Sequence, residues 1–65
     1  MTTLNDSLAA EIERCEELLG VYKQIPQGAF GASIIRSEIE FAKRALSAQD
    51  AAYMVKALTA LRGCN

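Results

Sequence analysis

The feature that most constrains this chain is a short interruption at residues 25–33, Ile-Pro-Gln-Gly-Ala-Phe-Gly-Ala-Ser, between two long helical patterns. It holds the only proline of the chain and two of its four glycines. Proline disfavours helical angles at the residue before it, so the first helix should end by about Gln24. Gly28 can act as a helix cap or adopt a positive φ angle without strain, so a second helix is expected to begin there or at Ala29.

Before the interruption, apolar residues recur every three or four positions over about residues 3–24, which predicts an amphipathic helix. This first stripe consists of Leu4, Leu8, Ile12, Cys15, Leu19 and Tyr22. Thr3 and Asp6 have the spacing of a capping box, which favours a helix start. Gly20 interrupts the helix, where glycine costs about 1 kcal/mol relative to alanine. We therefore expect another backbone to approach closely at Gly20.

The second helix is expected to run to about residue 47, and it carries two adjacent apolar stripes. One stripe consists of Ile35, Ile39, Ala42 and Leu46, and the other of Phe30, Ile34, Phe41 and Ala45. An apolar surface this wide is typical of a helix that contacts two neighbours. In the favoured interpretation of the turn, Phe30 fills the core beside it.

A second capping box, Ser47 with Asp50, predicts a third helix over about residues 48–61 that stops at Gly63. Its expected inner face consists of Ala51, Met54, Val55, Leu58 and Leu61. No alternating apolar pattern indicates a strand. The sequence therefore predicts one all-α domain over residues 1–65, an antiparallel helical hairpin plus a shorter third helix. Because the longer first helix would overhang the third, we expect a two-fold homodimer bundle.

The amino-acid composition limits the kinds of catalytic and metal sites that this chain can form. A chain of 65 residues builds only a small core, and this one has two cysteines and no histidine. A Cys/His metal site and a nucleophile paired with a histidine base are both disfavoured. We expect no catalytic residues, no metal and no cofactor. Cys15 and Cys64 are expected to be reduced thiols, with Cys15 acting as a small buried hydrophobe.

The net charge of −1 is distributed unevenly. Residues 1–25 carry five acidic and two basic side chains, and residues 26–65 carry three acidic and five basic ones. The basic residues are scattered, which disfavours nucleic-acid binding. The sequence also lacks the apolar run of a membrane span and the pattern of a secretory signal, so a cytoplasmic location is expected.

The Gly-Ala-Phe-Gly sequence at residues 28–31 also suggests an anion site, because helix N-termini bind anions. Free amides, Ser33 and Arg36 would hold the ligand. The lysine of a nucleotide-hydrolysing loop is missing after the second glycine, which disfavours that activity. A packed interhelical corner is the favoured interpretation of the same residues.

The run Glu-Leu-Leu-Gly-Val-Tyr-Lys-Gln-Ile-Pro at residues 17–26, followed by Gly-Ala-Phe-Gly-Ala at 28–32, resembles short phage- and prophage-encoded helical proteins of unknown role. The alanine-rich helix that follows the Ser47–Asp50 start extends the resemblance, which covers about residues 12–64. It implies no catalytic residues. It does imply a viral accessory protein in the host cytoplasm that binds and disables a host protein, including defence components.

The expected function is thus a non-enzymatic, dimeric interaction protein that binds and inhibits a host protein. One alternative is a small-ligand binder or sponge for a nucleotide or another anion. Another is a structural or regulatory helical adaptor. A DNA-binding repressor ranks below these. The candidate binding residues are Gln27, Gly28, Phe30, Gly31, Ser33, Arg36, Lys43, Arg44 and Tyr53.

Overall fold

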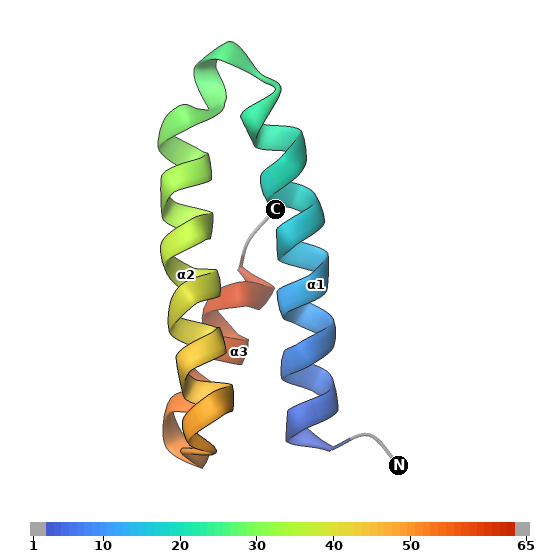
Figure 1. The fold of residues 1–65 in the computed structure, drawn as a ribbon, viewed down its shortest axis with the longest axis vertical. Helices are drawn as coiled ribbons and strands as arrows, with labels where there is room; N and C mark the ends of the chain where they lie inside the picture. Colours follow the sequence, from blue (N-terminus) through green and yellow to red (C-terminus); the bar gives the residue numbers. More distant parts are fainter. Residues whose placement is uncertain (1–2, 64–65) are drawn as a thin grey trace.

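The structure, a computed structural model, describes residues 3–63 and contains α-helices without strands in that range. The elements are α1 (Leu4–Lys23), the 3₁₀ turn η1 (Pro26–Gly28), α2 (Ala29–Ala48) and α3 (Ala51–Arg62). Helices α1 and α2 form an antiparallel hairpin with η1 at its tip, and α3 packs beside the half of the hairpin away from the tip (Figure 1). The all-α prediction is confirmed.

Both ends of α1 follow the sequence pattern. The Thr3 hydroxyl accepts a hydrogen bond from the Asp6 amide at 3.1 Å, and the Thr3 amide donates to the Asp6 carboxylate at 3.4 Å, so the predicted capping box is present. The helix ends at Lys23 with Gln24 as its C-cap, two residues before Pro26. The predicted end of the first helix is therefore confirmed.

Gly28 closes the hairpin tip. It is the N-cap of α2, as predicted, but its φ of −86° is not left-handed. Its need for glycine is steric, because a Cβ atom there would collide with the carbonyl oxygen of Tyr22. The Gly28 amide donates to the Ile25 carbonyl at 2.9 Å, which fixes the turn. The two long helices can therefore meet at a tight angle here.

The predicted boundary between the second and third helices is wrong. Ser47 lies inside α2, and Asp50 is the N-cap of α3, where its carboxylate accepts from the Tyr53 amide at 3.3 Å. Helix α2 ends at Gln49, whose φ of 55° is left-handed and whose amide bonds the last carbonyls of the helix. The connection is therefore Gln49–Asp50, and Asp50 caps the helix from outside instead of lying in its first turn.

The core lies among the three helices in the half of the hairpin that α3 covers. Its buried residues are Leu8, Ile12, Cys15, Ala32, Ile35, Ile39, Ala42, Ala45, Met54, Ala57, Leu58 and Leu61. The stripe predicted for the first helix faces inward, and Cys15 is fully buried as expected. The inner face of α3 differs from the predicted one, because Ala57 is buried while Ala51 and Val55 are exposed.

Two further expectations are wrong, both near the tip. Phe30 does not fill the core, since it is 79% exposed. Gly20 has no atom within 4 Å of where a Cβ would lie, so no backbone of this chain approaches it. The third helix, α3, is also short, with 12 residues against 20 in each of α1 and α2. At 1.5 Å per residue, α3 leaves about 12 Å of the hairpin uncovered.

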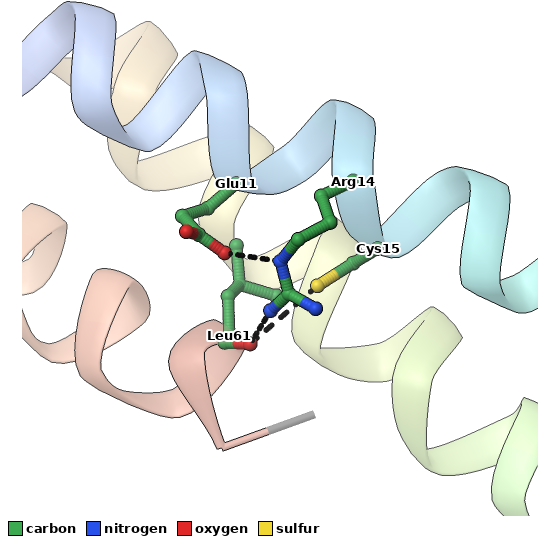
Figure 2. A network of polar contacts seen from close by, with 4 residues as sticks. All are labelled: Glu11, Arg14, Cys15 and Leu61. Atoms are coloured by element: carbon green, nitrogen blue, oxygen red, sulfur yellow. Dashed lines mark hydrogen bonds and ion pairs between the residues drawn. The ribbon is translucent and has the colours of Figure 1, made fainter. Parts of the chain in front are cut away.

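The end of α3 is fixed to the middle of α1 by a polar network that joins four residues (Figure 2). Arg14 donates from Nη2 to the Leu61 carbonyl at 2.7 Å and from Nε to the Glu11 carboxylate at 2.8 Å. The buried Cys15 thiol donates to the same Leu61 carbonyl at 3.6 Å. A cation at a helix C-terminus is favourable because the last carbonyls lack helical partners.

In residues 3–63, every helix is too short or too polar to cross a membrane. Cys64, for which a reduced thiol is expected, lies outside the described residues.

Candidate functional site

One side of α2 carries a regular row of residues of which only one, Phe41, packs against the core. Starting at Phe30, the row advances by four, three, four, three and four residues to Ala48, which is the heptad spacing of helices that pack along one another. We call this row the outer seam, and it consists of Phe30, Ile34, Ser37, Phe41, Arg44 and Ala48. All of these are exposed except Phe41, which is partly buried. The outer seam is therefore a largely exposed heptad face along α2, in which Phe41 alone packs against the core.

The tip end of the outer seam presents a large aromatic side chain to solvent. Phe30 is 79% exposed and Ile34 is 45% exposed. Full burial of such side chains typically contributes about 1.5–3 kcal/mol each, and this chain leaves most of that unused for Phe30 and almost half of it for Ile34. Helix α3 ends short of the hairpin tip (Figure 1).

At the other end, α3 lies against the seam and gives it an aromatic wall. The Phe41 and Tyr53 rings pack edge to face, with centroids 6.0 Å apart and planes at 90°. Lys56 lies over the Tyr53 ring, with Nζ 5.8 Å from the centroid. These contacts hold the half-exposed Tyr53 ring in one orientation beside α2.

Next to this wall is an open hollow of about 340 Å³, which we call the seam hollow. Its lining consists of Phe41, Arg44, Ala45, Ala48, Asp50 and Tyr53. The hollow exists because α2 has alanines at 45 and 48, and because the chain turns away at Gln49 and Asp50. Its two rings and two alanines make it suitable for an apolar side chain, with one cation and one carboxylate at its edge.

The residues predicted from the sequence fall into three places. Phe30, Arg44 and Tyr53 belong to the outer seam or its hollow. Lys43 instead pairs with Glu16 of α1 at 2.9 Å, with both side chains about half exposed, so it links the two long helices. The others gather around the turn: Gln27, Gly28, Gly31, Ser33 and Arg36.

The turn residues do not form a single site. Ser33, Arg36 and Lys23 line an open hollow of about 410 Å³ on one side, which we call the turn hollow. Gly31 lies toward the Tyr22 ring and belongs to a different hollow of about 390 Å³, beside the end of α3. Gly28 is buried in the turn. The predicted cluster is thus divided, and only Ser33 and Arg36 remain together.

The candidate list from the sequence missed Ile34, Phe41 and Ala48. The signal was present, because the steps of three and four from Phe30 can be read from the sequence. Ala45 was assigned to this stripe, whereas it is buried in the core and its exposed neighbour at the seam is Ala48. Which of two adjacent stripes is covered depends on α3, whose docking the helical period does not specify.

Within residues 3–63, no three His, Cys, Asp or Glu side chains lie close enough to hold a metal ion. Comparison of the chain with protein-family models, curated proteins and solved structures found no match.

Proposed function

We propose that this chain acts as a non-enzymatic interaction protein that binds another protein, helix against helix, along the outer seam. The observation that carries the proposal is Phe30, a large aromatic side chain that is 79% exposed at the end of a heptad-spaced row. Contiguous exposed apolar surface is typical of interaction sites, because it gains free energy when a partner covers it.

The composition of the seam supports the proposal. Interface cores are enriched in aromatic residues and arginine and depleted in lysine and glutamate. The outer seam has two phenylalanines, an isoleucine and Arg44, with Tyr53 beside them, and no lysine or carboxylate among its own residues. Hot-spot residues are drawn from the same types, so Phe30 and Arg44 are the anchors we expect.

The test compares binding by seam variants with binding by a matched variant off the seam. Val55 is a suitable control because it is 53% exposed and lies two residues after Tyr53, about 200° around α3. The immobilised wild-type chain and the Val55→Ser variant should capture the same protein from host lysate. The Phe30→Ser variant should lose it while keeping its circular dichroism spectrum. Equal capture by all three chains would contradict the proposal.

The source of the lysate follows from the resemblance to phage-encoded helical proteins, which implies a host protein as partner. Inhibition of that partner, including a defence component, is the functional consequence to assay once the partner is captured. The assay would add wild-type chain or Phe30→Ser to the purified partner and compare its activity. Equal inhibition by both chains would show that inhibition does not depend on binding at the outer seam.

The turn hollow favours a second candidate function, the binding of a small anion. Its lining brings Lys23 and Arg36 together with the Ser33 hydroxyl in about 410 Å³. A nucleotide that binds the folded chain raises its melting temperature with concentration. Arg36→Ala should abolish that rise, whereas Lys56→Ala, which removes an exposed cation beside Tyr53, should not. An unchanged melting temperature in millimolar nucleotide would exclude this function.

A further inference from the structure

We propose that the outer seam of the free protein is covered by a second copy of this chain, packed antiparallel about a two-fold axis, with Phe30 of each copy in the seam hollow of the other. This inference rests on the proposed helix-against-helix binding at the seam, and a captured host protein would displace the second copy from the same surface. The dimer would be isologous, with the same surface used by both copies.

The register follows from the spacing of the seam. The steps four, three, four, three and four read the same in both directions, so two antiparallel copies of α2 align every seam residue with another. Phe30 then faces Ala48, Ile34 faces Arg44, and Ser37 faces Phe41. Both phenylalanines meet a small residue, and Ile34 meets the aliphatic stem of Arg44. Large and small side chains thus alternate across the interface, as dense packing requires.

A parallel pairing fits less well. It places each seam residue against its own copy, so Phe30 meets Phe30 and Arg44 meets Arg44. Two arginines in contact repel each other, and both seam hollows stay empty. The antiparallel arrangement removes both problems with the same six residues on each copy.

The hollow and the exposed ring match in position as well as in chemistry. Ala48 lines the seam hollow, and in the antiparallel register it lies at the level of the partner's Phe30. The incoming ring would meet Phe41 and Tyr53, which already pack edge to face at 6.0 Å. A third ring extends this arrangement, because aromatic side chains favour such clusters. The Phe30 ring, which is 79% exposed in one copy, therefore reaches the seam hollow of the other.

Charges beside the seam are compatible with this register. Glu38 and Glu40 flank the two-fold axis on each copy, and Arg44 is the only cation of the seam. Arg44 lies on the same side of the seam as Glu40, and with 1.5 Å per residue it is about 9 Å along the axis from the level of the partner's Glu40. The arginine and glutamate side chains together span this distance, so each Arg44 offsets the Glu40 carboxylate of the other copy.

The available area indicates a reversible dimer. Helix α2 has 20 residues, about 30 Å in length, and the molecule is 20 Å wide in its second dimension. One copy would thus contribute at most about 600 Å², and the pair at most about 1,200 Å², the lower end of stable interfaces. We expect dissociation in the micromolar range.

Sedimentation velocity from about 1 to 500 µM tests the partner. The mass should rise from 7.0 kDa toward twice that value. Phe30→Ala should weaken association at least tenfold, whereas Val55→Ala should change it less than twofold. If the chain is still a monomer at the highest concentration, the partner is not a second copy and the proposal is wrong. If Phe30→Ser nevertheless abolishes capture of a different protein, the proposed function of the seam still stands.

Disulfide trapping tests the register in a Cys64→Ser background, where the remaining Cys15 is buried. The double variant Ile34→Cys with Arg44→Cys should form a covalent dimer on mild oxidation. An intrachain bond is excluded, because ten residues of one helix separate these positions by about 15 Å, beyond disulfide reach. Each single variant should stay uncrosslinked. Crosslinking by the single variants would indicate a parallel seam and overturn the antiparallel dimer.

Discussion

Gly20 and Gly28 show how differently two glycines act in one small protein. Gly20 lies on an open face of α1, and a Cβ atom there would meet nothing within 4 Å. Gly28 lies in the hairpin tip, where a Cβ atom would collide with the Tyr22 carbonyl oxygen. Only Gly28 therefore needs to lack a side chain, and Gly20 carries the entropic cost of glycine in a helix without a packing benefit.

We expect Gly20→Ala to stabilise the chain by about 0.5–1 kcal/mol, because alanine restricts the unfolded chain and suits a helix. In a domain of this size the melting temperature should rise by about 2–8 °C. Gly28→Ala should instead destabilise by about 1–3 kcal/mol through overpacking. Thermal unfolding followed by circular dichroism at 222 nm measures both. A Gly20→Ala variant that melts below the wild type would mean that another chain packs on this position.

At this scale the sequence predicts what depends on neighbours along the chain. The Thr3–Asp6 capping box was correctly predicted, since both partners lie within one turn. The surroundings of Gly20 and Phe30 were not, since they depend on which helix faces the docked neighbours cover. Seam residues such as Ile34 were missed for the same reason, because covered and uncovered stripes have the same helical period.

At the scale of the elements, the boundary between α2 and α3 depends on which of two residues caps α3. From the sequence, both residues are almost equally suitable as its N-cap. Ser47 and Asp50 are both good N-cap types, and Ser47 with Asp50 also has capping-box spacing. The structure extends α2 through Ser47, because Ala45 and Leu46 continue its packing and Gln49 ends it in a left-handed conformation. Gln49 also donates from its side chain to the Leu46 carbonyl at 2.6 Å, which completes the cap.

The assignment of the cap gives a paired prediction. Asp50→Ala removes the acceptor of the Tyr53 amide and should destabilise the chain by about 1 kcal/mol. Ser47→Ala should be neutral or slightly stabilising, because Ser47 is exposed inside α2 and alanine is the better helix former. Urea unfolding of the two variants measures the difference. If Ser47→Ala were the more destabilising variant, Ser47 would be the N-cap of α3, as the sequence predicted.

The polar network that joins α1 to the end of α3 allows a second pair of variants to be compared. Arg14→Met keeps the aliphatic stem but loses the bond to the Leu61 carbonyl, so the free energy of unfolding should fall by about 1 kcal/mol. Glu11→Gln removes only the charge of the partly exposed ion pair and should change stability by less than about 0.5 kcal/mol. Urea unfolding measures both, and equal losses would assign the effect to the ion pair instead of the helix end (Figure 2).

The whole molecule has a single core to which all three helices contribute, so its unfolding should be cooperative. Leu61 is fully buried where α3 meets the middle of α1, and Leu61→Ala should cost about 2–5 kcal/mol. Domains of this size have only about 3–10 kcal/mol of stability in total. We therefore expect the variant to lose most of its helical signal, not only the part from α3.

The control is Val55→Ala on the same helix. Val55 is 53% exposed, so its truncation should change stability by less than about 0.5 kcal/mol. Far-UV circular dichroism at 25 °C separates the two cases. If Leu61→Ala retains the signal of an intact α1–α2 hairpin, the hairpin is stable without α3 and the single-core description fails.

For the molecule as a whole, the sequence correctly predicted the all-α class and the three helices, because long apolar periods and a proline-glycine interruption determine them locally. The half of the hairpin that α3 covers could not be predicted, because it depends on the two-residue connection at Gln49–Asp50 and on contacts far apart in sequence. The seam hollow depends on the same docking, so the surface with the most specific shape was the least visible in the sequence.

The order of the helices along the chain also has a consequence during synthesis. Translation at 5–20 residues per second makes the 12 residues of α3 in on the order of a second, after both helices that it covers. Until then Leu8, Ile12 and Ile39 lack the helix that shields them. The nascent hairpin therefore passes through an interval in which its inner face is open to chaperones and proteases, and the arrival of α3 ends that exposure.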